Sequence, residues 1–155
     1  MSDALAPLIL IADDDDGVRA LVAETLTDFG AIVTAVADGA AAVTAAATTP
    51  FDACVLDVEM PVMNGLEACR RIRGTSFSKE LPILILTGRS DQQSIDAAFD
   101  SGAWDFLNKP VHGLLLWRRI SNMLTLSKIA QEAKTLESLI QLAKPPSAPP
   151  STSAE

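Results

Sequence analysis

Short, continuous apolar runs along the chain alternate with longer segments in which apolar residues recur every three or four positions. The short runs are typical of strands buried on both faces, and the longer periodic segments are typical of amphipathic helices. The runs predict five strands, at residues 8–12, 31–36, 52–57, 81–88 and 103–107. The periodic segments predict five helices, at residues 18–29, 38–48, 64–74, 90–102 and from about 111 onwards.

Strands that alternate with helices in this way predict βαβ units with right-handed crossovers. We therefore expect an α/β domain at residues 8–125, built on a five-stranded parallel sheet and preceded by a short arm at residues 1–7. The fourth predicted helix opens with Ser90 and Gln93, which have the spacing of a capping box.

The last predicted helix, from Leu114 to about Ala143, is roughly twice the length of an average globular helix. Steps of three and four residues alternate along Leu126, Ile129, Ala133, Leu136, Ile140 and Ala143. This seam predicts a helical extension at residues 126–143 that pairs as a dimeric coiled coil; the alternative is a helix that folds back on its own domain. Residues 144–155 are proline-rich and nearly uncharged, which predicts a disordered tail or linker.

Composition narrows the class of protein. A chain of 155 residues is long enough for one domain with a core, and its net charge of −8 argues against direct nucleic-acid binding, which needs a basic surface. The start "MSDALAPL" lacks the features of a signal peptide, and no apolar run approaches the ~18 residues of a membrane span. We expect a cytoplasmic protein with no membrane partner.

Polar residues gather where the predicted strands end. Asp13 and Asp14 follow the first strand, Asp57 ends the third, Thr87 ends the fourth, and Lys109 follows the fifth. Because ligands of open α/β sheets bind beyond the carboxyl ends of the strands, we expect these side chains to converge on one small site.

Clustered carboxylates repel one another unless a cation balances them, and hard oxygen ligands with open water positions suit Mg²⁺. A bound cation would keep Asp57 ionised, so that it could attack a phosphoryl group as carboxylates do in aspartyl-phosphate enzymes. Lys109 and the Thr87 hydroxyl would stabilise the charge on the transferred group, and Gly88 has no side chain to obstruct them.

Four stretches together resemble the receiver domain of two-component response regulators, a CheY-like domain. They are "ILIADDD", "DACVLDVEMPVMNGLEACRRIR", "PILILTG" and "GAWDFLNKP", which occur in this order between residues 9 and 110. The stretch "NKPVHGLLLWRRISNMLTLSK" is similar to receivers placed before domains that make or break cyclic-di-GMP. The resemblance implies a doubly wound, flavodoxin-like sheet with strand order 2-1-3-4-5.

The resemblance also implies roles for individual residues. Asp57 would accept a phosphoryl group from a sensor histidine kinase or phosphotransfer protein. Mg²⁺, for which Mn²⁺ can substitute, would be bound by Asp14 and Asp57 directly, by Asp13 through water and by the backbone carbonyl of Glu59. The phosphoryl oxygens would be bound at Thr87, Gly88 and Lys109.

In this family a threonine, here Thr87, moves toward the phosphate, and an aromatic side chain, here Phe106, turns inward. Together these movements alter the surface formed by the fourth helix, the fifth strand and the fifth helix. Phe106 lacks the hydroxyl of the tyrosine that is also common at this position. The resemblance further implies a cis Lys109–Pro110 bond. Glu59 and Arg89 follow site residues by two positions, and we hypothesise that they pair across the mouth of the site and hinder the hydrolytic water; the alternative is two unrelated solvated side chains.

These features predict a phosphorylation-driven switch that promotes its own phosphorylation and is slowly autodephosphorylated, but is not a turnover enzyme. A homodimer through the last helix is expected. One alternative is a Mg²⁺-dependent phosphohydrolase with Asp57 as nucleophile. Such enzymes typically carry an acid/base carboxylate two residues after the nucleophile, and Glu59 stands at that position. The other is a dimeric scaffold that works without phosphate.

Overall fold

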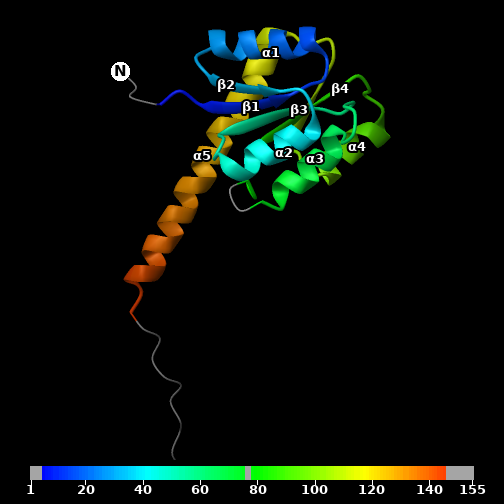
Figure 1. The fold of residues 1–155 in the computed structure, drawn as a ribbon. Helices are drawn as coiled ribbons and strands as arrows, with labels where there is room; N and C mark the ends of the chain where they lie inside the picture. Colours follow the sequence, from blue (N-terminus) through cyan, green and yellow to red (C-terminus); the bar gives the residue numbers. More distant parts are fainter. Residues whose placement is uncertain (1–4, 76–77, 146–155) are drawn as a thin grey trace, which may run out of the picture.

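The computed structural model describes residues 5–75 and 78–145, and it folds as an α/β sandwich around one parallel sheet (Figure 1). The strands are β1 (Leu8–Ala12), β2 (Ile32–Val36), β3 (Ala53–Asp57), β4 (Ile83–Thr87) and β5 (Asp105–Asn108). The helices are α1 (Asp16–Asp28), α2 (Gly39–Thr48), α3 (Gly65–Arg73), α4 (Gln92–Asp100) and α5 (Gly113–Ala143). The sheet order is β2-β1-β3-β4-β5, so the implied flavodoxin/CheY-like topology is confirmed. The predicted arm and tail lie partly outside the described residues, at 1–4 and 146–155.

Helices cover both faces of the sheet, which explains the continuous apolar runs of the strands (Figure 1). Alternate strand residues point to opposite faces: Ile9 and Ile11 pack with α1 and α5, whereas Leu10 and Ala12 pack with α2, α3 and α4. Strands β3 and β4 are buried along their whole length, and the carboxyl ends of all five strands meet at one edge of the sheet.

Aspartate and asparagine side chains begin most of the helices. Asp15, Asp38 and Asn64 each accept a hydrogen bond from a backbone N–H in the first turn of the helix that follows. The predicted capping box at the start of α4 is wrong. Asp91, not Ser90, is the N-cap, and its carboxylate accepts from both the backbone N–H and the hydroxyl of Ser94.

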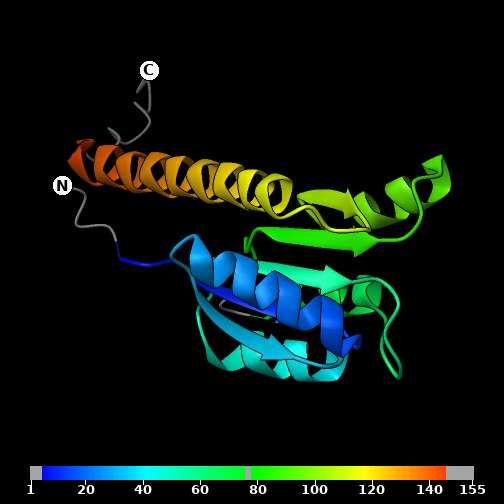
Figure 2. The same ribbon diagram turned by 90° about the horizontal axis from the view of Figure 1, so that it is seen from above.

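Helix α5 has two halves with different surroundings. Its first half buries Leu116, Ile120 and Met123 against the sheet. Its second half continues past the rest of the domain without bending back, as both views show (Figures 1 and 2). Residues 130–143 are all exposed, so the extension does not fold back on its own domain. None of the helices within residues 5–75 and 78–145 has the length and hydropathy needed to span a membrane.

Candidate functional site

Three acidic side chains converge at the carboxyl edge of the sheet. Carboxylate oxygens of Asp13, Asp14 and Asp57 all lie within 4.8 Å of one another. Asp13 and Asp57 are almost completely buried, whereas Asp14 is exposed. The backbone N–H of Asp15 donates to Asp13 Oδ1 over 3.0 Å, which ties this carboxylate to the start of α1. The predicted convergence of acids from the first and third strands is therefore present.

Lys109 supplies the positive charge of the cluster. Its ammonium nitrogen lies 3.0 Å from Asp57 Oδ1 and 3.2 Å from Asp13 Oδ2. The backbone N–H of Lys109 donates to the carbonyl of Thr87 over 2.8 Å, so β4 and β5 together position the lysine. The Lys109–Pro110 peptide bond is cis, as the resemblance implied. Burial lowers the pKa of Lys109, but the hydrogen bond and charge of Asp57 with the charge of Asp13 raise it further, and the net direction is upward.

Asp57 occupies an environment that disfavours its charge. Burial is the largest influence and raises its pKa, and the neighbouring charge of Asp13 raises it further. The hydrogen bond from Lys109 and one from the backbone of Glu59 act in the opposite direction, and the net shift is upward. A further positive charge at the cluster would therefore favour the ionised, nucleophilic form of Asp57.

The donor set fits a hard divalent cation. Three carboxylates face one ammonium, so the cluster carries excess negative charge. Asp13 Oδ2 is buried, and among the described residues no donor is aligned for a hydrogen bond to it, although the Lys109 ammonium lies 3.2 Å away. An oxygen-only cluster with an unsatisfied buried acceptor and an exposed member, Asp14, matches the ligands and the open access that Mg²⁺ requires.

Gly65, which the sequence pattern did not single out, lets α3 begin very close to the end of β3. A Cβ at Gly65 would lie 2.1 Å from the carbonyl oxygen of Asp57, so only glycine lets α3 begin this close to the end of β3. Its backbone N–H donates to the carbonyl of Val58 over 2.9 Å. The "NG" pair before a helical segment is the sequence signal that could have identified it.

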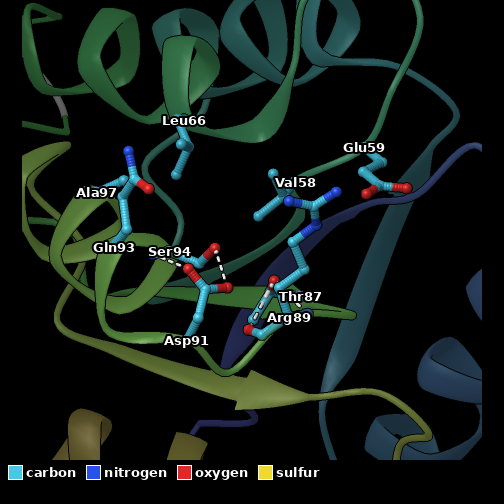
Figure 3. Close-up of a pocket in the computed structure, with 9 residues that line it drawn as sticks. All are labelled: Val58, Glu59, Leu66, Thr87, Arg89, Asp91, Gln93, Ser94 and Ala97. Carbon is cyan, nitrogen blue, oxygen red and sulfur yellow. Dashed lines mark hydrogen bonds between the residues drawn. The ribbon is translucent and has the colours of Figure 1, made fainter.

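Thr87 and Gly88 lie beside the acidic cluster at the end of β4. Thr87 is buried, and its hydroxyl accepts a 3.0 Å hydrogen bond from the backbone N–H of Arg89 (Figure 3). Gly88 is exposed, with open space where a side chain would be. The hydroxyl would have to leave Arg89 in order to bind an incoming group, and nothing at Gly88 obstructs that group.

A pocket of about 300 Å³ adjoins Thr87 between β3, α3 and α4 (Figure 3). Val58, Leu66 and Ala97 form its apolar part, and Glu59 and Arg89 lie on its polar side. The two charged side chains are exposed and line the same pocket, but no ion pair joins them in the part of the chain that the structure describes.

Phe106 lies in β5, and its half-buried side chain is on the face of the sheet that α4 covers. It packs against the core on the side of α2, α3 and α4. Its ring meets Phe99 of α4 edge to face, with 5.9 Å between the ring centres. Contacts with neighbouring apolar side chains therefore hold the ring, as expected for an aromatic without a hydroxyl.

Comparison of the sequence with known proteins identifies the family of this chain. The family model for the response regulator receiver domain matches residues 9–121. Response regulator MprA of Mycobacterium tuberculosis is 39% identical over 128 residues, which are 83% of this chain and 55% of MprA. Transcriptional regulatory protein AfsQ1 of Streptomyces coelicolor is 38% identical over 118 residues, or 76% of this chain and 51% of AfsQ1. The chain thus spans about half the length of these relatives.

Solved structures give the same answer for the fold. The receiver domain of the sensor histidine kinase PA1611 from Pseudomonas aeruginosa PAO1 superposes with a TM-score of 0.73 at 30% identity, over 77% of this chain and 98% of that one. That receiver was solved with a magnesium ion coordinated in its active site cleft. Chemotaxis protein CheY4 of Vibrio cholerae has a TM-score of 0.73 at 33% identity, over 76% and 98% of the two chains.

The family match, the relatives and the fold agree with the acidic cluster and its lysine at the carboxyl edge of the sheet. The chain therefore belongs to the response regulator receiver domain family, the phosphoacceptor domains of two-component signalling.

Proposed function

We propose that Asp57 accepts a phosphoryl group from a phosphohistidine on a sensor histidine kinase or phosphotransfer protein. An Asp57 carboxylate oxygen attacks phosphorus, the bond from phosphorus to the histidine nitrogen breaks, and an acyl phosphate remains on the aspartate. The observation that carries the proposal is the contact between the Asp57 carboxylate and the Lys109 ammonium inside a cluster that also holds Asp13 and Asp14.

Asp13, Asp14 and Asp57 would hold Mg²⁺, with the backbone carbonyl of Glu59 as a further ligand. When bound, the ion would offset the repulsion between the carboxylates and attract the phosphoryl oxygens. The magnesium ion in the cleft of the Pseudomonas receiver supports this assignment. Lys109, already 3.0 Å from Asp57, would bind a phosphoryl oxygen, as would the Thr87 hydroxyl and the backbone N–H of Gly88.

The switch would begin at Thr87. Binding a phosphoryl oxygen requires its hydroxyl to leave the backbone N–H of Arg89, which shifts the loop between β4 and α4. Phe106 pairs with Ile85 of β4, two residues before Thr87, and its ring packs on Phe99 of α4, so the ring would turn inward as the end of β4 and α4 move. The outcome is a changed surface on α4, β5 and α5, which an output domain or partner would recognise.

Residues 126–143 would form the dimer interface with a second copy of the chain. Leu116 is buried against the body of the domain. Lys134 follows Leu116 by 18 residues, which is five full helical turns, so it lies on the same side of α5 and pairs with Glu80 of the body. Leu136 follows Leu116 by about five and a half turns and therefore faces away. Because Leu126, Ile129, Leu136 and Ile140 are at least half exposed at a/d spacing, a copy of the same helix is the complementary partner.

Truncation after Leu124 tests this interface. Sedimentation equilibrium should show a dimer for the full chain and a monomer for the truncated one, because the truncation removes Leu126 and every apolar a/d residue after it. A truncated protein that still sediments as a dimer would place the interface elsewhere.

Glu59 and Arg89 are proposed to slow hydrolysis of the acyl phosphate by restricting water at the mouth of the pocket they line. The phosphoryl half-life should shorten in Glu59→Ala and in Arg89→Ala. Unchanged half-lives in both variants would show two unrelated solvated side chains.

The described receiver has an acidic site, and the chain carries a net charge of −8, which supports a protein partner for this domain. AfsQ1 is named a transcriptional regulatory protein, and it contains about as much chain again outside the matched region.

Acetyl phosphate with Mg²⁺, followed by intact mass measurement, tests the proposed function. The chain should gain one phosphoryl group and keep it for minutes, and Asp57→Asn should gain none. Rapid turnover of acetyl phosphate without an adduct would indicate a phosphohydrolase. Neither adduct nor turnover would indicate a scaffold that works without phosphate.

A further inference from the structure

Asp105, at the start of β5, connects the backbone of Phe106 to helix α5. Arg119 Nη1 of α5 lies 3.1 Å from Asp105 Oδ2 and 3.4 Å from Oδ1. The same Oδ1 accepts a 2.8 Å hydrogen bond from the backbone N–H of Phe106. One carboxylate at the start of β5 is therefore bound both to the backbone of the switch aromatic and to a side chain of α5.

The a/d spacing of α5 can be followed back beyond residue 126. Counting back from Leu126 in alternating steps of four and three residues reaches Asn122, Arg119 and Leu115. All three side chains are exposed in the structure, although they lie on the half of α5 that packs against the sheet. The a/d spacing thus runs over about four heptads from Leu115 to Ala143, with polar residues at Arg119 and Asn122 and apolar residues at the other positions.

Arg119 is the charged residue of this extended seam. In a parallel pair of helices, each a position meets the same residue of the second copy, so two Arg119 side chains in the seam would repel each other. Asp105 lies on β5, at the side of α5 that faces its own domain, and holds the guanidinium there.

We infer that a second copy of this chain pairs along the whole seam from Leu115 to Ala143, and that the Asp105–Arg119 ion pair sets the strength of this pairing. This inference rests on the proposed function, in which Phe106 moves on phosphorylation. The inward turn of the Phe106 ring would displace the Phe106 backbone N–H, and with it the Asp105 carboxylate that accepts from this N–H. Arg119, once released, enters the seam and weakens the dimer.

The dimer dissociation constant of the full, unphosphorylated chain tests the ion pair. Asp105→Asn frees Arg119 and should raise the Kd about tenfold, and Arg119→Leu fills the seam position and should lower it about tenfold. In the double variant Asp105→Asn/Arg119→Leu, the Kd should equal that of Arg119→Leu alone, because no charge remains to be released. Lys128→Leu, at an exposed position of α5 outside the a, d, e and g positions that form or flank the seam, is the control and should change the Kd less than threefold.

Phosphorylation with acetyl phosphate adds the second readout. It should raise the Kd of the wild type and leave that of Arg119→Leu within threefold of its unphosphorylated value. An equal change in both proteins, or an equal effect of Asp105→Asn in the presence and absence of Arg119, would overturn the role of the ion pair. A chain that stays monomeric at all concentrations would overturn the pairing itself.

The two proposals fail separately. Absence of a phosphoryl adduct on the wild-type chain would contradict the proposed function, whereas the Kd values of the unphosphorylated variants would still decide whether Asp105 restrains Arg119. Arg119→Leu should form the adduct as the wild type does, because Arg119 does not contact the acidic cluster.

Discussion

The carboxyl edge of the sheet differs from the C-terminal half of α5 in what holds each in place. At the edge, residues from β1, β3, β4 and β5 meet, two carboxylates are buried, and an ammonium contacts both of them. In the C-terminal half of α5, residues 130–143 are exposed, and the described contact to the body is the ion pair of Lys134 with Glu80. The site is thus fixed by the fold itself, whereas the apolar stripe of the extension is exposed in the single chain, and we propose that a second copy buries it.

This difference predicts that substitutions at the edge change stability strongly and substitutions on the extension do not. Lys109→Met should have the largest effect, lowering the free energy of unfolding by about 3 kcal/mol without metal, because Asp13 and Asp57 lose their buried counter-charge. Urea unfolding measures the loss, and Mg²⁺ should restore part of it. Lys128→Met, at an exposed position of α5, is the control, and an equal loss in both variants would contradict the role of the ammonium.

Gly65→Ala should come next, with a loss of about 2 kcal/mol, since its Cβ would overlap the carbonyl oxygen of Asp57. The variant should also be phosphorylated more slowly, because the end of β3 must shift. Gly88→Ala adds the same methyl group where no atom lies within 4 Å, and its unfolding free energy should change by less than about 0.5 kcal/mol. Similar losses in the two variants would show that the close approach at Gly65 has no structural importance.

Asp57→Asn should have a smaller and opposite effect that depends on pH. Burial and then the Asp13 charge raise the pKa of Asp57 in the folded protein above its ordinary value of 3.8. The carboxyl group therefore contributes stability below that ordinary value, and the contribution is lost as pH rises through the raised folded pKa. Without metal, the asparagine variant should unfold at higher urea than the wild type at pH 7 and lose this advantage near pH 3. An advantage that is equal at both pH values would contradict the assigned direction.

Lys134→Ala should have the smallest effect. The Lys134–Glu80 pair is well exposed on both sides, and such pairs contribute about 0.5 kcal/mol or less. Urea unfolding of the domain should therefore hardly change. A loss well above about 1 kcal/mol would mean that the body, rather than a second copy, supports the extension.

The sequence predicted the fold and the convergence of the site because both follow from order along the chain. In a parallel sheet the residues after each strand share one edge, so Asp13, Asp57 and Lys109 had to meet there. Strand limits were less exact: the fifth strand, expected at 103–107, is Asp105–Asn108.

Features that depend on side-chain geometry could not be predicted. The start of α4 offered two adjacent caps, and Asp91 prevails over Ser90 because its carboxylate accepts two hydrogen bonds from Ser94. The guanidinium of Arg73 donates to the carbonyls of Leu81 and Gly102, a contact between segments that no spacing indicates. The Asp105–Arg119 pair likewise becomes visible only once β5 lies beside α5.

Mapping of the acyl phosphate to one residue decides whether Asp57 is the phosphoacceptor. The chain is treated with acetyl phosphate in the presence of Mg²⁺ or of EDTA and is then digested with pepsin at acid pH. The masses of the peptides are measured by mass spectrometry. We predict a phosphoryl group on Asp57 alone, and only in the sample with Mg²⁺. A phosphoryl group on another residue, or equal labelling of Asp57 in EDTA, would contradict the assignment of this acidic cluster as a cation-dependent phosphoacceptor site.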